Sequence, residues 1–368
     1  MRRVCLIGDA SGSNRGRSLI KFLAGKNDIA FYYSDKKFYL QADGYISYLA
    51  LRCFRFLEYF ISIFYIAISD VIYILPMGRA YVIERLICKV FRKRVVYDFY
   101  ISHYDTYVND RKTVKKKTRE AYRLMKIDRG LFKAASCIIF LNNSERSYYL
   151  DVIGKKSFKK NSVIIPLFSE IQSVAQLPYV HSVSNSVTLC WWGSVIPLHG
   201  IDVIIDSAKI LKDRGVNFSL YLLGKSDEKF REHRETANTL DLLDYVFFKT
   251  DKRMDDGSLI EFLSDHCDIA LGSFGSSDKA KTVLLNKIVE ASAQSLPVIT
   301  QHSQGASEYF KDGESISFVG GDATELADKI EYYSKNKEKL KYISCRAQEV
   351  YRKNFTEEMF IKKLKGIL

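Results

Sequence analysis

Asn286, Lys287 and Glu290 stand close enough in the sequence to form one charged site at the start of a predicted helix. Asparagine is favoured at the N-cap, so we expect the helix to begin at Lys287 with its free backbone N–H groups available to an anion. Lys287 and Glu290 are three residues apart and therefore share a helix face. The lysine could hold a phosphate and the glutamate two sugar hydroxyls, or the two could be a solvated surface pair.

Glycine-containing turns follow two predicted strands in the same half of the chain. The turn residues are Gly193, Ser194, His199 and Gly200 after the strand at 187–192, and Gly224 and Lys225 after the strand at 218–223. Glycine lets the backbone approach an anion closely. His199 could hydrogen-bond a phosphate or could be structural, and Lys225 could bind a phosphate or lie in solvent.

Two further groups of polar residues follow strands in the first half. Gly12, Ser13, Asn14 and Arg15 come after the opening strand, and Asp98, His103 and Asp105 come after a strand at 95–97. A short glycine-containing turn is a weak indication of a phosphate or sugar site. A carboxylate or imidazole at the end of a strand could orient a hydroxyl or accept its proton. The alternatives are a capped turn at Asp98 and a surface histidine at His103.

Strands and helices alternate along the whole chain, which predicts parallel sheets covered on both faces. Strands are expected at 4–8, 28–33, 71–75, 95–97, 137–141, 163–166, 187–192, 218–223, 246–249, 269–271, 297–300 and 316–319. Helices are expected at 45–67, 80–92, 112–134, 200–213, 258–264 and 287–294. A further helix is expected to end at 23, a short one to begin at 144, and helices to fill the chain from about 324 onward. The pattern restarts after 169–186, a stretch without strong periodicity that we interpret as a linker.

The architecture predicted from this order is two doubly wound, Rossmann-like α/β domains. The first covers 1–170 and the second 187–350, followed by a C-terminal helix over 351–368 that packs back on the first domain. In such folds the ligand site lies at the carboxyl ends of the strands, here expected to face a cleft between the domains.

Charge is distributed unevenly between these two halves. Residues 1–180 contain 31 Lys and Arg against 15 Asp and Glu, a net charge of +16, whereas residues 181–368 carry −3 (25 against 28). The basic half is expected to meet an anionic partner such as phospholipid headgroups, a phosphorylated substrate or nucleic acid. Basic residues concentrate at 112–119 and again at 155–160, and a run of lysines of this kind can also be an ordinary solvated face.

The spacing of the cysteines and the length of the apolar segments indicate the cellular compartment and exclude some classes of protein. The seven cysteines are scattered without a C-x-x-C pair, which favours reduced core thiols over zinc ligands or a disulfide framework. The apolar run near the N-terminus is too short for a secretory signal, so a cytoplasmic location is expected. The apolar stretch 59–69 is too short to span a bilayer, but it could be a buried helix or make an in-plane membrane contact.

Four segments in order resemble a family 4 glycosyltransferase of the GT-B fold, in particular bacterial members with an IPLHG loop and an FGxSxKA…NK segment. They are WGSVIPLHG at 192–200, LLGK at 222–225, DIALGSFGSSDKAK at 268–281, and NKIVEA at 286–291 followed by LPVIT at 296–300. In the first half, YDF at 97–99, Ser102, YDT at 104–106 and DRK at 110–112 are similar to the same subgroup. The resemblance is continuous from about 187 to 320 and patchy before it.

The resemblance implies a hexosyltransferase that retains anomeric configuration and needs no bound metal or other cofactor. The nucleotide sugar would bind to the second domain, with Glu290 on the ribose hydroxyls, and Thr250, Phe274, Gly275 and Lys281 would join the residues named above. Family members commonly carry a glutamate eight residues before Glu290, where this chain has Thr282, so a mechanism that requires that carboxylate is in doubt. Many relatives also place Arg and Lys where Ser194 and His199 stand.

The expected function is therefore transfer of a sugar from a nucleotide diphosphate to a surface glycan of the lipopolysaccharide, capsule or O-antigen type. The acceptor is expected to be lipid-linked, the protein peripheral on the anionic inner membrane surface, and the donor a UDP-sugar because UDP is the commonest carrier. Rival interpretations are a degenerate glycosyltransferase that binds without turnover, another enzyme on the same scaffold, and a nucleic-acid-binding protein. No nucleic-acid-binding motif supports the last, so nucleic acid is not an expected partner.

Overall fold

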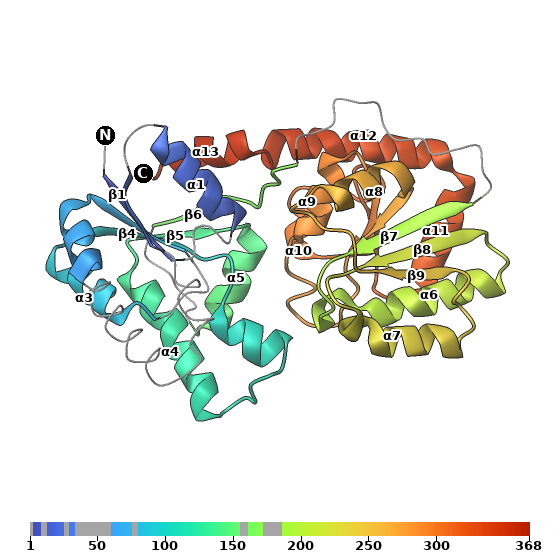
Figure 1. Cartoon of the computed structure of the whole chain (residues 1–368), viewed down its shortest axis with the longest axis horizontal. Coiled ribbons are helices and arrows are strands. Elements are labelled where there is room, and N and C mark those ends of the chain that lie inside the picture. Colours follow the sequence, from blue (N-terminus) through green and yellow to red (C-terminus); the bar gives the residue numbers. More distant parts are fainter. Residues whose placement is uncertain are drawn as a thin grey trace. The chain divides into compact units, whose positions relative to one another are not determined.

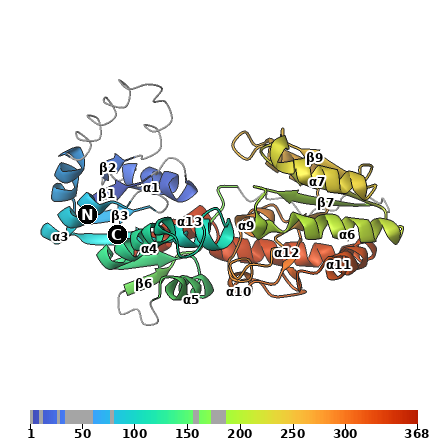
Figure 2. The same cartoon turned by 90° about the horizontal axis from the view of Figure 1, so that it is seen from below.

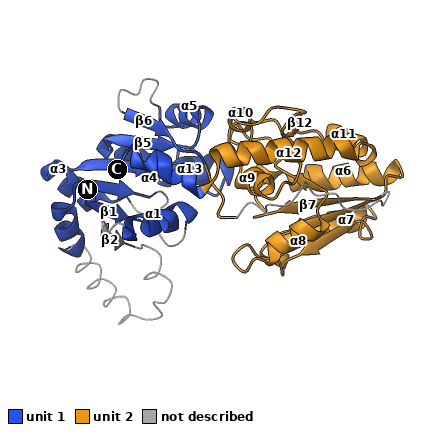
Figure 3. Ribbon diagram, turned by 90° about the horizontal axis from the view of Figure 1, so that it is seen from above, with its two compact units in different colours: residues 1–166, 357–368 blue, residues 167–356 orange. Residues whose placement is uncertain are grey.

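The computed structural model describes residues 3–8, 13–25, 29–33, 60–75, 80–154, 161–171 and 186–368. The chain divides into two compact units, which Figure 3 colours separately. Unit 1 comprises Met1–Pro166 together with Glu357–Leu368, and unit 2 comprises Leu167–Thr356. Each unit contains a six-stranded sheet whose paired strands are all parallel, so the doubly wound α/β fold is confirmed.

The sheet of unit 1 has the strand order β2-β1-β3-β4-β5-β6. Its strands are β1 (Val4–Ile7), β2 (Ile29–Tyr33), β3 (Val71–Ile74), β4 (Arg94–Asp98), β5 (Cys137–Phe140) and β6 (Asn161–Ile164). Its helices are α1 (Asn14–Ala24), α3 (Val82–Val90), α4 (Arg119–Ala134), α5 (Asn143–Val152) and α13 (Glu357–Lys365), with a π-helix over Asp105–Asp110. Residues 60–68 are also helical.

Helices cover both faces of this sheet (Figure 1). Helix 60–68, α3, α4 and α5 bury apolar side chains in one core on one face, including Ile66, Cys88, Phe132 and Tyr149. Helices α1 and α13 pack against each other on the opposite face, where the Ser18 hydroxyl donates to a Glu357 oxygen at 2.6 Å. The C-terminal helix therefore belongs to unit 1, but it begins at Glu357 and not at 351, because 351–354 are the end of helix α12 (Lys337–Asn354) in unit 2.

The expected helix at 112–134 is wrong in its first turns. Helix α4 begins only at Arg119, because the extended Thr118 is its N-cap and accepts a hydrogen bond from the Ala121 N–H. In the lysine run before it, Lys112 and Lys117 have φ angles of 53° and 64°, which a continuous α-helix does not allow.

The sheet of unit 2 has the order β12-β11-β10-β7-β8-β9. Its strands are β7 (Val187–Trp192), β8 (Phe218–Leu223), β9 (Val246–Lys249), β10 (Ile269–Leu271), β11 (Val298–Gln301) and β12 (Ser317–Val319). Its helices are α6 (Ile201–Asp213), α7 (Asp227–Thr239), α8 (Ser258–His266), α9 (Asn286–Ala293), α10 (Gln304–Ser307), α11 (Ala323–Lys335) and α12 (Lys337–Asn354), with a 3₁₀ turn at Pro197–His199.

Two apolar cores lie on the opposite faces of this sheet. One is built with α6, α7 and α11, and the other with α8, α9 and α12. Helix α7, which follows β8 and lies beside the edge strand β9 (Figure 2), has no counterpart in the sequence prediction. Its sequence DEKFREHRETANT is almost wholly polar and buries only Phe230 and Ala237, so its apolar periodicity is weak.

Two sequence predictions fall partly outside the described residues. Only 169–171 and 186 of the proposed linker 169–186, and only the last part of the proposed helix 45–67, are described. Within the described part of the chain, no helix combines the length and the hydropathy needed to cross a membrane.

Candidate functional site

The residues predicted to form a charged site in unit 2 meet at the carboxyl edge of its sheet. Strand β7 ends at Trp192 and strand β10 ends at Leu271. Helix α9 follows β10 in the chain and begins at Asn286. Parallel strands present their carboxyl ends at one edge, so the loops after β7 and β10 and the start of α9 converge. This convergence brings together residues that lie almost 100 positions apart.

Lys287 is the buried lysine of this edge. Its side chain is 5% exposed, its Nζ donates to the Gly272 carbonyl at 3.1 Å, and Nζ lies 4.0 Å from the centre of the Trp191 ring. Burial lowers the pKa of Lys287 well below its usual value, although the Glu290 carboxylate opposes this shift. An arriving anion would restore the charged form, so the amine is suited to a phosphate ligand.

His199 lies beside the same lysine. Its Nδ1 is 2.7 Å from the Ser194 carbonyl oxygen, which can only accept, so Nδ1 carries the proton of the neutral ring. Burial, and then the nearby Lys287 charge, lower the pKa of His199 to about 3, while the Ser194 carbonyl opposes the change. Neutral His199 has no second N–H to donate, so as a phosphate donor it would need to gain a proton.

Glu290 is held by the other tryptophan of β7. Trp192 Nε1 donates to the Glu290 carboxylate at 2.7 Å. Burial raises the pKa of Glu290, whereas the Trp192 hydrogen bond and the Lys287 charge lower it. Lys287 and Glu290 thus share a helix face as predicted, but each charge is held by a different tryptophan and not only by its neighbour.

The predicted N-cap is wrong by one residue. Helix α9 begins at Asn286, its N-cap is Leu285, and no side chain caps it. Leu285 is extended and packs against apolar neighbours, which sets the turn into the helix one residue earlier than the polar residue suggested. Asn286 is exposed on the first turn.

The loop after β7 is fastened to the segment after β10. The Phe274 N–H donates to the His199 carbonyl at 3.0 Å, and the Ser273 hydroxyl donates to the Leu198 carbonyl. A Cβ added at Gly275 would lie 2.4 Å from the Leu198 carbonyl oxygen, so only glycine permits this close approach. Phe274 is buried and therefore supports the loop with its side chain.

The remaining predicted residues of unit 2 lie in turns and loops of the same unit. Gly193 and Gly200 have φ angles of 139° and 59°. A Cβ at Gly224 would lie 2.4 Å from the Phe230 ring, so the packing of this ring leaves room only for glycine. The side chains of Ser194, Lys225 and Lys281 are exposed, and the Thr250 hydroxyl donates to Asp227 at 3.0 Å.

Thr282 stands where the family resemblance leads us to expect a glutamate. It is 7% exposed, and its hydroxyl donates to the Asp278 carbonyl at 2.7 Å, within its own turn. This position therefore supplies no carboxylate to the cluster around Lys287.

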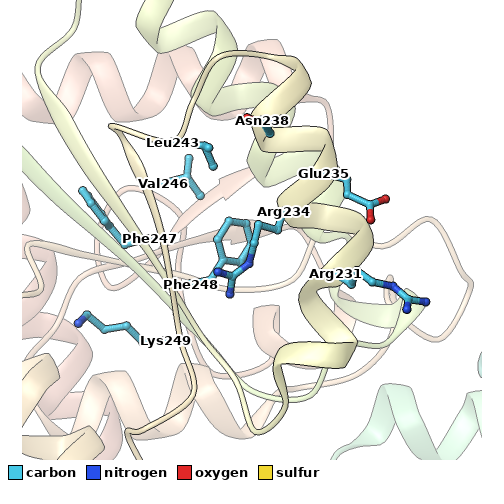
Figure 4. Close-up of a pocket in the computed structure, with 9 residues that line it drawn as sticks. All are labelled: Arg231, Arg234, Glu235, Asn238, Leu243, Val246, Phe247, Phe248 and Lys249. Carbon is cyan, nitrogen blue, oxygen red and sulfur yellow. The ribbon is translucent and has the colours of Figure 1, made fainter.

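A groove of about 610 Å³ runs along the edge strand β9 and helix α7 (Figure 4). Its lining includes Arg231, Arg234, Phe248 and Lys249, and the Arg234 guanidinium lies 5.1 Å from the centre of the Phe248 ring. None of the predicted site residues lines this groove, although Lys249 adjoins Thr250. The groove follows the sheet edge and is distinct from the cluster around Lys287.

In unit 1, Arg15 and Asp98 form a buried ion pair. Arg15 Nε and Nη2 donate to the two Asp98 oxygens at 2.8 and 3.0 Å, with the side chains 5% and 0% exposed. The Tyr73 hydroxyl donates to Asp98 at 2.7 Å, and Arg15 also donates to the Pro166 carbonyl at 2.9 Å. The Arg15 guanidinium lies 4.7 Å from the centre of the Phe360 ring of α13.

This pair changes the interpretation of both residues. Arg15 was predicted to lie in an anion-binding loop, but its guanidinium donates to Asp98 and to backbone carbonyls. Asp98 was predicted to act on an acceptor, but its side chain is fully buried. The Ser13 hydroxyl accepts from the Gly16 N–H as the N-cap of α1, and Asn14 accepts from Arg17 at 2.6 Å. Gly12 lies outside the described residues.

His103 and Asp105 belong to a second buried polar network. His103 Nδ1 is 3.0 Å from Asp128, and Asp128 also accepts from the Ser102 hydroxyl at 2.7 Å. Asp105 accepts from the Tyr148 hydroxyl at 2.5 Å and lies at the start of the π-helix. π-Helical turns are rare and frequently occur at functional sites.

Sequence reasoning missed Asp128 and Tyr148 in this network, and Trp191, Trp192 and Gly272 in unit 2. Asp128 and Tyr148 lie inside helices α4 and α5, where nothing local distinguishes them from other helical positions. The two tryptophans give a signal that could have been used, since they are adjacent at the carboxyl end of a buried strand. Among the described residues, no group of three or more His, Cys, Asp or Glu is placed to hold a metal ion.

Comparison with known proteins supports the resemblance. Residues 183–350 match the family model described as Glycosyl transferases group 1. The capsular polysaccharide biosynthesis glycosyltransferase CapM of Staphylococcus aureus is 25% identical over 198 residues, covering 52% of this chain. That match covers 48% of CapM, about half the length of this curated relative.

Solved structures share the fold of the whole chain. HepE of Anabaena, in complex with UDP and glucose, is similar over 100% of this chain and 99% of its own, with a TM-score of 0.68 and 15% identity. Sucrose-phosphate synthase of Thermosynechococcus elongatus is similar over 100% of this chain and 98% of its own, with a TM-score of 0.72 and 13% identity. The stretch 183–350, which carries the cluster around Lys287 and Glu290, is therefore a glycosyl transferases group 1 domain.

Proposed function

We propose that this protein transfers a sugar from a nucleotide diphosphate donor to a glycan acceptor. The observation that supports this most directly is the pairing of a buried lysine and a half-buried glutamate with two tryptophans at the carboxyl edge of the unit 2 sheet. Lys287 lies on Trp191, and Glu290 accepts from Trp192, inside the stretch that matches the family model. In this proposal Lys287 meets the diphosphate and Glu290 the ribose hydroxyls.

The chemistry follows from the charge that develops as the sugar leaves. Departure of a nucleoside diphosphate concentrates negative charge on its terminal phosphate, and a positioned cation stabilises that charge most where water is excluded. Lys287 is fixed by the Gly272 carbonyl and the Trp191 ring, so it needs little reorganisation during the reaction. The N-terminus of α9 adds backbone N–H groups at the same place.

The finer features of the reaction are part of the same proposal. UDP is the proposed nucleotide, supported by the HepE structures in complex with UDP and with UDP-glucose. A surface polysaccharide is the proposed acceptor class, supported by the similarity to CapM, a capsular polysaccharide biosynthesis glycosyltransferase. Retention of anomeric configuration, a lipid-linked acceptor and independence from a bound metal are carried over from the family resemblance.

We assign the acceptor to unit 1 and propose a cytoplasmic location at an anionic membrane surface. The basic residues of the run 112–119 are all exposed, which leaves their charge available to phosphate groups. His103 and Asp105 are the proposed contacts for the acceptor hydroxyl, through the buried network that holds them.

Thermal unfolding of the full chain with UDP, GDP, ADP and CDP tests the donor assignment. A ligand at 100 times its Kd stabilises the folded state by about 2.7 kcal/mol. We expect UDP to raise the unfolding midpoint of the wild type and Glu290→Gln to lose this shift. Glu338→Gln, which removes an exposed carboxylate on α12 of the same unit, should keep it.

Two outcomes would count against the proposal. If no nucleotide shifts the midpoint of a folded chain, the donor site around Lys287 is not a nucleotide site. If UDP binds but no sugar is released or transferred from UDP-sugars under any acceptor, the chain is a binding protein. The hydroxyl of Thr282, bonded within its own turn in place of a carboxylate, is the structural reason to make this second measurement.

Trp192 supplies a more specific test of the ribose contact. Replacing it by phenylalanine keeps an aromatic ring in the core but removes the N–H that Glu290 accepts. The pKa of Glu290 should rise further, because that hydrogen bond lowers it. We expect Trp192→Phe to weaken UDP binding by roughly tenfold, the worth of one hydrogen bond to a charged group, with a steeper loss as pH falls from 8 to 6. Equal titration curves for variant and wild type would contradict this role.

A further inference from the structure

The exposed apolar side chains of this protein are concentrated on two helical segments of unit 1. The described residues expose thirteen large hydrophobic side chains, and eight of these lie in 60–64 and 82–91. They are Phe60, Ile61, Phe64, Val82, Ile83, Leu86, Val90 and Phe91. Single exposed apolar residues are ordinary, but a contiguous group marks an interaction surface. We call this group the apolar face.

The two segments lie next to each other and are already packed on their inner sides. Ile66 of helix 60–68 and Cys88 of α3 belong to one core against the sheet. Lys93, just after α3, donates to the carbonyls of Ala67 and Ser69 at 2.6 and 2.7 Å, which joins the carboxyl ends of both segments. The apolar face is therefore the outer side of helices whose inner side is buried.

An ordinary surface helix is apolar on one side only. In α3 the inner side holds Glu84 and Cys88, 2% and 3% exposed, whereas Leu86 and Val90 on the outer side are 59% and 77% exposed. This arrangement places the one carboxylate of α3 inside and the apolar side chains of Leu86 and Val90 outside. The core of unit 1 does not explain it, because the core uses the other side of the helix.

The charges that border the apolar face are mainly basic. Lys89 and Arg92 are exposed at the end of α3, Glu84 of α3 is buried, and the exposed Asp70, which follows helix 60–68, is held by Arg3. An anionic lipid surface attracts such residues and accepts the apolar side chains at the boundary between headgroups and acyl chains. A protein partner whose interface is bordered by charges of both signs would not require an apolar face bordered mainly by basic residues.

We propose that the apolar face docks unit 1 on an anionic phospholipid bilayer, with α3 and helix 60–68 lying in the plane of the interface. The nine residues of α3 extend about 14 Å, too short to cross the hydrocarbon region, so the contact is peripheral. The inference deepens the proposed function by naming the surface that meets the membrane. It rests on exposure and charge and on no residue of the donor site.

Vesicle co-sedimentation of the full chain tests this proposal. We expect the wild type to bind vesicles of phosphatidylcholine with 30% phosphatidylglycerol, and to bind vesicles of phosphatidylcholine alone at least tenfold more weakly. Leu86→Glu/Val90→Glu should lower binding to the anionic vesicles at least tenfold. Lys89→Gln/Arg92→Gln should lower it about tenfold or more, and 0.5 M salt should have a similar effect on the wild type.

The matched control is Leu243→Glu/Met254→Glu, which places two carboxylates at exposed apolar positions of unit 2. It should bind the vesicles as the wild type does, and all variants should unfold at similar temperatures. Equal vesicle binding by Leu86→Glu/Val90→Glu and wild type, or no binding by the wild type, would overturn the proposal. So would a wild-type dimer in light scattering that the same double variant turns into a monomer, because the apolar face would then join two chains.

The vesicle assay contains neither nucleotide nor acceptor, and the nucleotide assay contains no lipid. A chain that binds UDP but not vesicles therefore overturns the docking surface and leaves the proposed reaction standing. A chain that binds vesicles but no nucleotide overturns the proposed reaction and leaves the docking surface standing.

Discussion

Lys287→Met is expected to raise the unfolding midpoint of unit 2 and to lower its affinity for a nucleoside diphosphate by about 10- to 100-fold. The affinity loss corresponds to removal of one hydrogen bond between charged groups, worth about 1.5–3 kcal/mol. The stability gain has a separate cause. The pKa of Lys287 is well below its usual 10.5 because burial penalises the ammonium group, so folding is opposed by the charge.

The pH dependence of this gain has a definite sign. Between the folded pKa of Lys287 and 10.5 the unfolded chain binds more protons than the folded chain, so wild-type stability rises with pH in that window. Methionine does not titrate, so the advantage of Lys287→Met should be largest at low pH and vanish above about pH 10.5. We expect about 1 kcal/mol at neutral pH, or a midpoint higher by about 2–4 °C.

Lys341→Met is the control, because it removes an exposed lysine from α12 of the same unit. It should leave both the nucleotide affinity and the midpoint unchanged. A lower midpoint for Lys287→Met would mean that the Gly272 carbonyl and the Trp191 ring compensate the buried charge fully. An unchanged affinity would place the diphosphate elsewhere.

Asp98→Ala is expected to destabilise unit 1 by about 3–5 kcal/mol, the usual cost of removing one partner of a buried ion pair. The reason is that the Arg15 guanidinium, 5% exposed, would remain inside without its carboxylate. The Tyr73 hydroxyl would lose its acceptor as well. Chemical unfolding monitored by circular dichroism measures the effect, with unit 1 expected to unfold first.

A double variant distinguishes a structural pair from a catalytic carboxylate. Arg15→Met/Asp98→Leu replaces both charges by apolar groups, so its loss of stability should be clearly smaller than that of Asp98→Ala. UDP affinity should be unchanged in both variants, since the proposed donor site lies in unit 2. If the double variant is restored in stability and in transferase activity, Asp98 is structural. If it folds well but stays inactive, the acceptor role of Asp98 regains support.

The sequence by itself determined the architecture and the approximate place of the charged cluster around Lys287 in unit 2. Alternating strands and helices are local patterns, and they predicted all twelve described strands within a few residues. Lys287 and Glu290 could be placed on one helix face because their spacing of three residues is itself a helical property. Helix α7 was missed because the prediction depends on local apolar periodicity, and the few apolar residues of this helix leave little periodicity to detect.

Only the tertiary structure decided what the charged residues contact. Arg15 and Asp98 lie 83 positions apart, and they meet because β1 and β4 stand two strands apart in the order β2-β1-β3-β4, with Tyr73 of β3 between them. Trp192 and Glu290 lie 98 positions apart and meet because β7 is central in its sheet. Strand order is set by the packing of whole helices and strands, and the spacing of neighbouring residues does not encode it.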